Sequence, residues 1–110
     1  MAPHSMKAAI VSVGNELLFG LTVDTNAAWL GRSLADLGLP VVRRFTVGDV
    51  AVDIREALSR AMECADLVLV SGGLGPTPDD LTKGVVAQML DRPLVVDSAV
   101  WSGLEARFRA

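Results

Sequence analysis

The sequence predicts an α/β fold of three layers, in which a mostly parallel sheet with strand order 2-1-3-4 carries helices on both faces. Apolar runs of strand length alternate along the chain with segments whose apolar residues recur at helical spacing. The first run, Lys7 to Val13, is almost wholly apolar from Ala8 onward, as in a strand buried on both faces of a parallel sheet. With 110 residues, of which 51% are hydrophobic, the chain is long enough for one domain with a real core.

A strand, a helix and a second strand are predicted first. The polar turn Gly14-Asn15-Glu16 and a connection to Val23 follow the first strand. Asp24-Thr25-Asn26 supplies side chains that cap a helix N-terminus, and Gly38 ends the helix. The apolar face of this helix is formed by Ala27, Leu30, Leu34 and Leu37. Val41 to Val47 is the second strand, and Gly48-Asp49 is the turn after it.

The alternation continues in the second half of the chain. The apolar face of the second helix is formed by Ile54, Leu58, Ala61 and Met62, and the third strand is Leu67 to Ser71. A third helix begins near Leu81, and its apolar face is formed by Leu81, Val85, Val86, Met89 and Leu90. Leu94 to Val96 is predicted as a short fourth strand, and Asp97 or Ser98 as the cap of a final helix through Phe108. Residues 1–6 have no periodicity and read as a leader or loose terminus, which leaves 7–110 as the domain.

Composition excludes several classes of function. The net charge of −3 gives no basic field for nucleic acid or anionic lipid. No apolar run approaches the length of a membrane span, and the start of the chain lacks the pattern of a secretion signal, so a cytoplasmic location is expected. Cys64 is the only cysteine and His4 the only histidine, so neither a disulfide nor a histidine-based catalytic triad can form within the chain. Carboxylates, hydroxyls, amides and backbone groups must perform any chemistry.

The stretch from Ser71 to Thr82 is the strongest indication of function. Three glycines in four residues, Gly72, Gly73 and Gly75, let the backbone turn sharply and approach a ligand closely. The helix that follows offers free N–H groups and a positive dipole end, which favour an anion such as phosphate. Asp79 and Asp80 would repel a phosphate directly, which suggests a divalent cation bridging carboxylate and phosphate oxygens.

The predicted topology brings further polar residues to this loop. Parallel strands end at one edge of the sheet, and ligands bind where successive connections leave in opposite directions, here between the first and third strands. Loops 14–20, 48–49 and 72–80 should therefore meet. Simpler roles remain open at this stage, since Asp80 can be a helix N-cap and the hydroxyls of Thr77 and Thr82 can bond their own backbone.

Four segments in this order resemble the N-terminal domain of the competence/damage-inducible protein family CinA. They are Gly14-Asn15-Glu16-Leu17-Leu18-Phe19-Gly20, Asp24-Thr25-Asn26, Val47-Gly48-Asp49 and Gly72-Gly73-Leu74-Gly75-Pro76-Thr77-Pro78-Asp79-Asp80-Leu81-Thr82. The resemblance extends, less closely, to the molybdenum-cofactor biosynthesis domain of MoaB, MogA and MoeA, which binds molybdopterin. It covers Lys7 to the end of the chain, which is shorter than the family's domain, so an incomplete domain is expected.

The resemblance implies roles for particular residues. In the wider family the glycine-rich loop matching Gly72 to Gly75 holds the pterin phosphate, and the aspartates matching Asp49 and Asp80 contribute to the site. In the CinA branch the domain is associated with metal-dependent cleavage of the ADP-ribose pyrophosphate. The predicted ligand-binding residues are Gly14, Asn15, Gly72, Gly73, Leu74, Gly75, Thr77 and Asp79.

Two hypotheses of function follow. In the first, Glu16, Asp49 and Asp80 hold Mg²⁺ or another divalent cation, Asp49 and Asp80 act in catalysis, and a nucleotide-sugar pyrophosphate such as ADP-ribose is hydrolysed. In the second, the same loop binds a molybdopterin-like or nucleotide ligand without turnover, or the domain serves in oligomer assembly. Trp29 and Trp101 lie off the main apolar stripes, which favours a homo-oligomer in either case.

Overall fold

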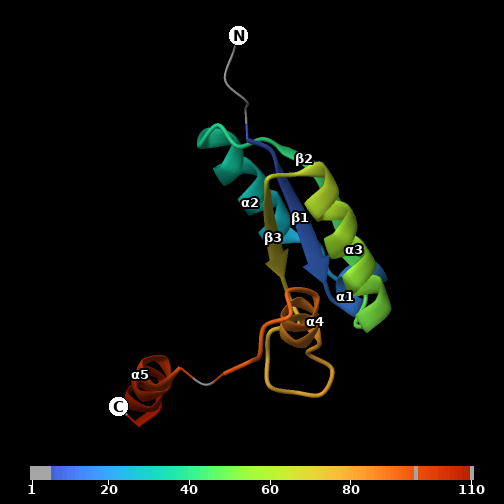
Figure 1. Cartoon of the computed structure of the whole chain (residues 1–110). Coiled ribbons are helices and arrows are strands. Elements are labelled where there is room, and N and C mark those ends of the chain that lie inside the picture. Colours follow the sequence, from blue (N-terminus) through green and yellow to red (C-terminus); the bar gives the residue numbers. More distant parts are fainter. Residues whose placement is uncertain (1–5, 96, 110) are drawn as a thin grey trace.

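A computed structural model of the chain describes residues 6–95 and 97–109, with side chains described up to residue 107. The elements in chain order are β1 (Ala8–Val13), α1 (Asn15–Leu18), α2 (Thr25–Asp36), β2 (Val41–Val47), α3 (Ala51–Cys64), β3 (Leu67–Ser71), α4 (Thr82–Met89) and α5 (Ser98–Arg109) (Figure 1). The predicted leader falls on residues 1–6, of which residues 1–5 lie outside the described part.

The sheet has three parallel strands in the order β2-β1-β3, which confirms the first three places of the predicted order. Val13 of β1 pairs with Val47 of β2, and Ser12 pairs with Ser71 of β3. All six residues of β1 are buried because strands flank it on both sides and helices cover both faces. The almost wholly apolar β1 therefore occupies the centre of the sheet, as predicted.

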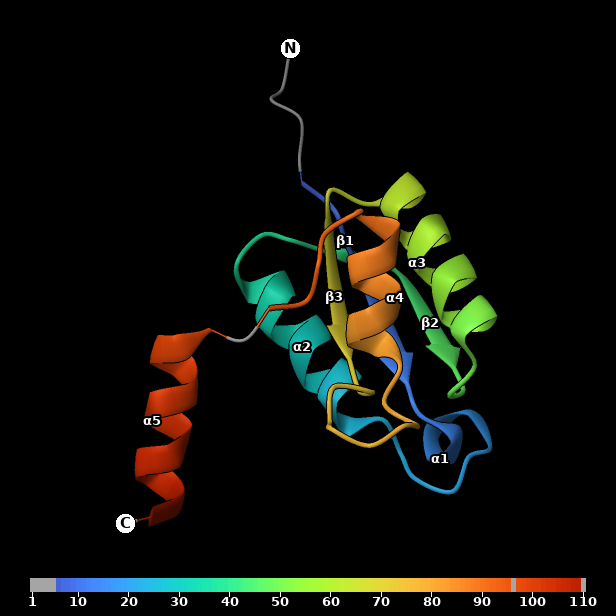
Figure 2. The same ribbon diagram turned by 60° about the horizontal axis from the view of Figure 1, so that its bottom comes forward.

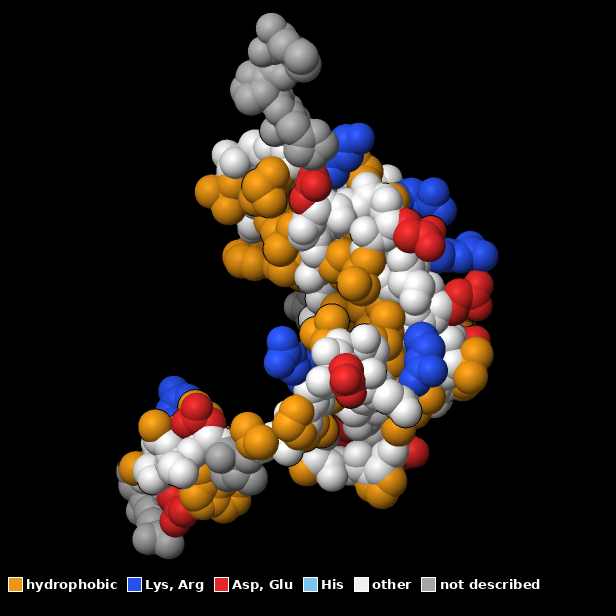
Figure 3. All heavy atoms as spheres, viewed as in Figure 1, with side chains coloured by type: hydrophobic (Ala, Val, Ile, Leu, Met, Phe, Trp, Pro, Cys, Tyr) orange, Lys and Arg blue, Asp and Glu red, His pale blue; other side chains and the backbone are white. Residues whose placement is uncertain are grey.

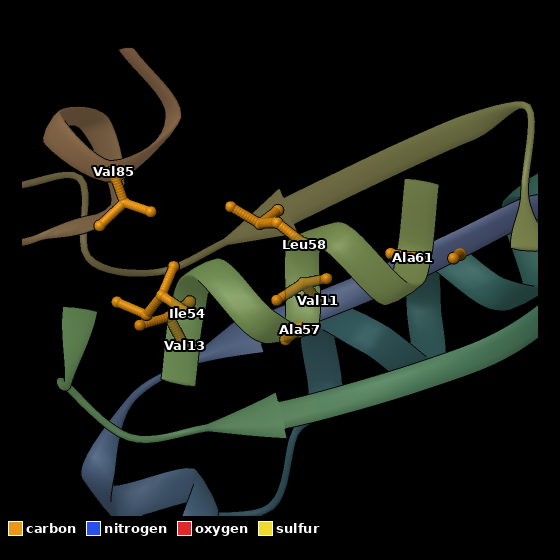
Figure 4. Packing of buried hydrophobic residues seen from close by; sticks show 8 residues of the cluster. Val11, Val13, Ile54, Ala57, Leu58, Ala61 and Val85 are labelled. Atoms are coloured by element: carbon orange, nitrogen blue, oxygen red, sulfur yellow. The ribbon is translucent and has the colours of Figure 1, made fainter. Parts of the chain in front are cut away.

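The three layers follow from the alternation of side chains along the strands. Ala9, Val11 and Val13 point from β1 into the main hydrophobic core, where they meet α3 and Val85 of α4 (Figure 4). The α3 residues of this core are Ile54, Ala57, Leu58 and Ala61, at the predicted helical spacing. The alternate β1 residues, also buried, turn to the opposite face, where α2 packs with Ala27 and Leu34 buried (Figure 2). Helices on both faces are thus confirmed.

Local signals place α2 where the sequence predicts it. Asp24 is its N-cap, and Oδ1 of Asp24 accepts a hydrogen bond from the N–H of Ala27 at 3.0 Å. Gly38 follows the helix with φ of 78°, a left-handed conformation that glycine adopts without steric cost. Asp97 likewise caps α5, because its Oδ1 accepts from the N–H of Val100 at 3.0 Å.

Two parts of the fold differ from the prediction. The polar turn after β1 is a short helix, α1, in which the N–H of Leu18 donates to the carbonyl of Gly14 at 3.1 Å. The predicted fourth strand is wrong at Leu94 and Val95, which belong to no strand and are 65% and 81% exposed; Val96 lies outside the described residues. Pro93, which has no N–H to donate to a sheet, precedes them, and the segment leads away from β3 toward α5 (Figure 1).

Helix α5 stands apart from the rest of the structure in both ribbon views (Figures 1 and 2). It runs to Arg109, one residue past the predicted end. None of the helices in residues 6–95 and 97–109 has the length and hydrophobicity of a membrane-spanning helix.

Candidate functional site

The carboxyl ends of all three strands meet at one edge of the sheet, as the sequence predicts. The N–H of Gly14, after β1, donates to the carbonyl of Val47 at the end of β2 with a length of 2.9 Å. On the other side of β1, a Cβ added to Gly72 would lie only 2.0 Å from the carbonyl oxygen of Val13. The loops after β1, β2 and β3 are therefore in direct contact, at the switch point where a parallel sheet binds its ligands.

Asn15 joins the loops after β1 and β2. Its Oδ1 accepts a hydrogen bond of 2.9 Å from the N–H of Asp49. The same oxygen would lie 2.5 Å from a Cβ added to Gly48, so the close approach depends on a glycine at that position. The sequence predicts Asn15 as a ligand-binding residue, and the structure gives its oxygen a partner within the fold.

Glu16 lies in the first turn of α1, and its exposed carboxylate folds back over Gly14. A Cβ added to Gly14 would lie 2.7 Å from Oε1 of Glu16. The main-chain carbonyl of Glu16 accepts hydrogen bonds from the N–H groups of Leu21 and Thr22, at 2.9 and 3.2 Å, which closes the loop after α1. The carboxylate of Glu16 thus lies at the sheet edge, while the main-chain carbonyl of the same residue holds the loop.

Gly72 and Gly73 form the turn between β3 and the glycine-rich loop, with φ of 94° and 67°. A Cβ on Gly73 would lie 2.2 Å from Oγ1 of Thr82. Buried Thr82 closes the turn, since its hydroxyl donates to the carbonyl of Gly72 at 2.8 Å and its N–H donates to the carbonyl of Gly73 at 3.1 Å. The hydroxyl of Thr82 thus serves the backbone, which is the more usual of its two predicted roles.

The N–H groups of Gly73 and Leu74 donate no hydrogen bond within the described residues. They lie beside the start of α4, whose N-cap, Leu81, forms no side-chain cap. An eight-residue helix with an uncapped N-terminus has free N–H groups and a partial positive charge at that end. The exposed Lys83 adds a full positive charge in the first turn of α4. Sequence reasoning missed Lys83, although its position after Thr82 in the predicted first turn was a usable signal.

Hydrogen bonds join Asp80 to Thr77 in the later part of the glycine-rich loop. Oδ2 of Asp80 accepts from the N–H of Thr77 at 3.1 Å and from the hydroxyl of Thr77 at 2.5 Å. The pKa of Asp80 is lowered, and the hydrogen bond from the Thr77 hydroxyl is the largest cause. Partial desolvation raises this pKa. The N–H groups of Thr77 and Gly75 and the Lys83 cation lower it further. The N-cap interpretation of Asp80 is wrong, because α4 begins after Leu81 and the Asp80 carboxylate bonds backward to the loop.

The predicted metal ligands do not form a ready coordination site. Over residues 6–95 and 97–109, no three His, Cys, Asp or Glu side chains lie close enough together to hold a metal ion. Glu16 folds over Gly14, and one oxygen of Asp80 is already used by Thr77. In this arrangement the carboxylates Glu16, Asp49 and Asp80 do not fit the metal set that the sequence predicts, so the cation and the catalytic roles of Asp49 and Asp80 stay predictions.

Fold and loop together define a doubly wound α/β domain with a glycine-rich loop at its switch point. The chain belongs to the family described as "Probable molybdopterin binding domain", which it matches over residues 9–110. Among curated relatives it is 47% identical over 103 residues to a CinA-like protein of Gemmatimonas aurantiaca and 52% identical over 89 residues to a CinA-like protein of Desulfovibrio desulfuricans. These matches cover 94% and 81% of this chain but only 24% and 21% of the relatives, so the chain spans about a quarter of their length or less.

Solved structures agree with this assignment. CinA of Thermoplasma acidophilum, a protein described as of unknown function, matches with a TM-score of 0.86 and 39% identity, over 94% of this chain and 62% of its own. The molybdopterin biosynthesis enzyme MoaB of Thermus thermophilus matches with a TM-score of 0.73 and 26% identity, over 81% of this chain and 57% of its own. The chain is thus a CinA-like member of the family, and the predicted resemblance is confirmed.

Proposed function

We propose that this domain binds a phosphate-containing small molecule of pterin or nucleotide type at the loop from Gly72 to Thr77. The observation that carries the proposal is the pair of N–H groups on Gly73 and Leu74, which have no acceptor within the described residues and lie beside the uncapped start of α4. A phosphate supplies the acceptor oxygens and the negative charge that these groups favour.

Two further features support an anion at this loop. Two hydrogen bonds from Thr82 fix the glycine turn, so the loop backbone is held in place before a ligand arrives. Lys83 provides a positive charge in the adjacent helical turn that can neutralise part of the ligand charge. The family description and the MoaB neighbour favour a pterin phosphate within this ligand class.

A more specific hypothesis is that the domain also catalyses metal-dependent hydrolysis of a pyrophosphate such as that of ADP-ribose. In this reaction water adds to one phosphorus atom and the bridging oxygen leaves with the other phosphate. The sequence supports this hypothesis, because Glu16, Asp49 and Asp80 all follow strands that end at this edge of the sheet and carboxylates hold divalent cations. The arrangement of these carboxylates favours binding over turnover, so binding is the primary proposal and hydrolysis the second.

The test is calorimetric titration of the chain with ADP-ribose, a pterin phosphate and inorganic phosphate, each in Mg²⁺ and in chelator. We expect saturable binding of at least one organic phosphate that persists in chelator, and no product by chromatography. Lys83→Met should weaken the affinity by a factor of roughly 1.5 to 5, since an exposed charge contributes about 0.2–1 kcal/mol. Arg60→Met serves as the control, because Arg60 is an exposed cation on α3 that pairs with Glu56.

The outcomes separate the two hypotheses. Product that forms only with Mg²⁺ would establish hydrolysis and replace binding as the main function. Absence of binding to all three compounds by a folded chain would refute the proposed site. An equal loss of affinity in the Lys83 and Arg60 variants would mean that general charge, and not the loop, attracts the ligand.

A further inference from the structure

The loop after β2 is fixed to the end of β1 at two successive points. At the first point, the N–H of Gly14 donates to the carbonyl of Val47 at 2.9 Å. At the second, Oδ1 of Asn15 accepts from the N–H of Asp49 at 2.9 Å. The backbone at Gly48 lies so close to this oxygen that an added Cβ would be only 2.5 Å from it. These contacts are complete within the described residues and set the course of the chain as far as Asp49.

The hydrogen bond from Asp49 to Asn15 fixes a position more than it satisfies a buried group. Asn15 is exposed, so water can serve both the amide oxygen and the N–H of Asp49 when the bond is broken. Asp49 is half-buried, and its carboxylate makes no hydrogen bond or ion pair with the described residues. The side chain of Asn15 therefore holds the main chain of a carboxylate whose oxygens can accept hydrogen bonds from a ligand.

We propose that Asn15 is a positioning residue, which holds Asp49 so that its carboxylate accepts hydrogen bonds from the organic part of the ligand. This inference rests on the proposed function, in which the phosphate of the same ligand binds the loop from Gly72 to Thr77. β2 and β3 lie on either side of β1, so their loops are two strand spacings, or about 10 Å, apart. An inorganic phosphate is too small to contact both loops.

The ligand class follows from the chemistry of the two ends. An ionised carboxylate only accepts hydrogen bonds, so the ligand must carry O–H or N–H groups at a distance from its phosphate. The sugar hydroxyls of ADP-ribose and the ring N–H groups of a pterin phosphate both meet this requirement, and separate titrations tell them apart. Inorganic phosphate has no organic part and reports on the glycine-rich loop alone.

The test is calorimetric titration of the chain, in chelator, with ADP-ribose, a pterin phosphate and inorganic phosphate. The measured quantity is the affinity for each organic phosphate divided by the affinity for inorganic phosphate. Asn15→Leu keeps the size of the side chain but removes the acceptor, and it should lower this ratio roughly three- to tenfold, about the effect of one hydrogen bond. Asn15→Asp keeps the acceptor and should leave the ratio near the wild-type value, because its added charge repels the phosphate of every probe.

Two further variants test how Asn15 acts. Gly48 has no left-handed φ, so the methyl group of Gly48→Ala acts through its contacts with Oδ1 of Asn15 and with Cδ2 of Leu18, 3.2 Å away. This variant should lower the ratio as Asn15→Leu does. Asp49→Ala removes the carboxylate itself. If Asn15 acts through that carboxylate, adding Asn15→Leu to Asp49→Ala should lower the ratio no further.

The outcomes distinguish this inference from the proposed function. Circular dichroism and melting curves check that each variant folds. A wild-type chain that binds none of the three probes would refute the proposed function and this inference with it. If the organic phosphates bind, an unchanged ratio in folded Asn15→Leu, or an equal fall in Asn15→Asp, would overturn the role of Asn15.

Two other results would overturn the route through Asp49. Additive losses in the double variant would mean that Asn15 contacts the ligand itself. A fall in the ratio that appears with Mg²⁺ but not in chelator would mean that Asp49 acts through a cation and not as a direct hydrogen-bond acceptor.

Discussion

The hydroxyl of Thr77 donates a hydrogen bond of 2.5 Å to Oδ2 of Asp80, and the N–H of Thr77 donates to the same oxygen at 3.1 Å. The two residues thus close a small ring within the glycine-rich loop, and the ring depends on the charge of one carboxylate. Such charge-assisted hydrogen bonds are roughly twice as strong as neutral ones. The loop that is proposed to receive phosphate is therefore held at both ends, by Thr82 at the glycine turn and by Asp80 beyond it.

The first prediction concerns the pH dependence of this ring. The pKa of Asp80 is lowered in the folded chain, chiefly by the Thr77 hydroxyl, so ionised Asp80 stabilises the fold above the unfolded pKa of about 3.9. This stabilisation is lost as pH falls through the lowered folded pKa. Melting temperatures of wild type and Asp80→Asn should therefore differ at pH 6 and converge under acid conditions. A difference that stays constant with pH would contradict the charge-dependent ring.

The second prediction concerns the glycine turn. Gly72→Ala should cost about 2–4 kcal/mol of unfolding free energy, because a left-handed residue with Cβ is strained and this Cβ would meet the Val13 carbonyl at 2.0 Å. Gly38→Ala separates the backbone strain from the steric clash, since Gly38 has φ of 78° but open space around it. This substitution should cost only about 1–2 kcal/mol.

Gly31→Ala should change the free energy of unfolding in the opposite direction in the same experiment. Gly31 lies within α2 with nothing near its Cβ position, so alanine there should stabilise the chain by roughly 0.5–1 kcal/mol. Urea unfolding of the three variants gives all the values. If Gly72→Ala were no worse than Gly38→Ala, the close approach of the β3 turn to β1 would be disproved.

The third prediction concerns the buried hydroxyl of Thr82. Thr82→Val keeps the side-chain shape but leaves the carbonyl of Gly72 without its 2.8 Å partner, and it should cost about 1–2 kcal/mol. The same variant should weaken phosphate-ligand binding, because the turn is no longer fixed before the ligand arrives. Thr46→Val, on exposed β2, should change stability by less than about 0.5 kcal/mol. Equal losses in both variants, measured by urea unfolding, would remove the special role of Thr82.

The fourth prediction concerns the core between the sheet and α3. Ile54 is fully buried against β1, so Ile54→Ala should cost about 2–5 kcal/mol. Val52, two residues earlier on the same helix, is 72% exposed, and Val52→Ala should stay within about 0.5 kcal/mol. Chemical denaturation gives both values. A small effect at Ile54 would mean that α3 packs on the sheet through a different face.

The sequence predicts the regular part of this fold well because that part depends on local periodicity. The run from Ala8 to Val13 indicates a central strand, and the spacing of Ile54, Leu58 and Ala61 indicates the buried face of α3. Asp24 and Asp97 are correct caps, since capping depends on residues only three positions away. The parallel topology then places the site loops at one edge without further information.

The failures concern contacts that local patterns do not encode. Helix α1 has only four residues, fewer than the helical periodicity needs to be visible. The apolar run of Leu94 and Val95, in which valine favours strands, predicts a strand whether or not a sheet edge lies beside it. Asp80 looks like an N-cap by position, but its carboxylate turns back to Thr77. The carboxylates Glu16, Asp49 and Asp80 share an edge by topology, which does not fix where their oxygens point.

The central position of β1 also has a consequence for how the domain is made. β1 ends at Val13, whereas its neighbours β2 and β3 end at Val47 and Ser71. On the ribosome, β1 therefore emerges first and acquires its second neighbour only when the chain has been extended to Ser71. Until then an apolar strand keeps one unpaired side, which exposes the nascent chain to association with other chains. Of the three strands described, the central one is thus the one that needs the longest protection during synthesis.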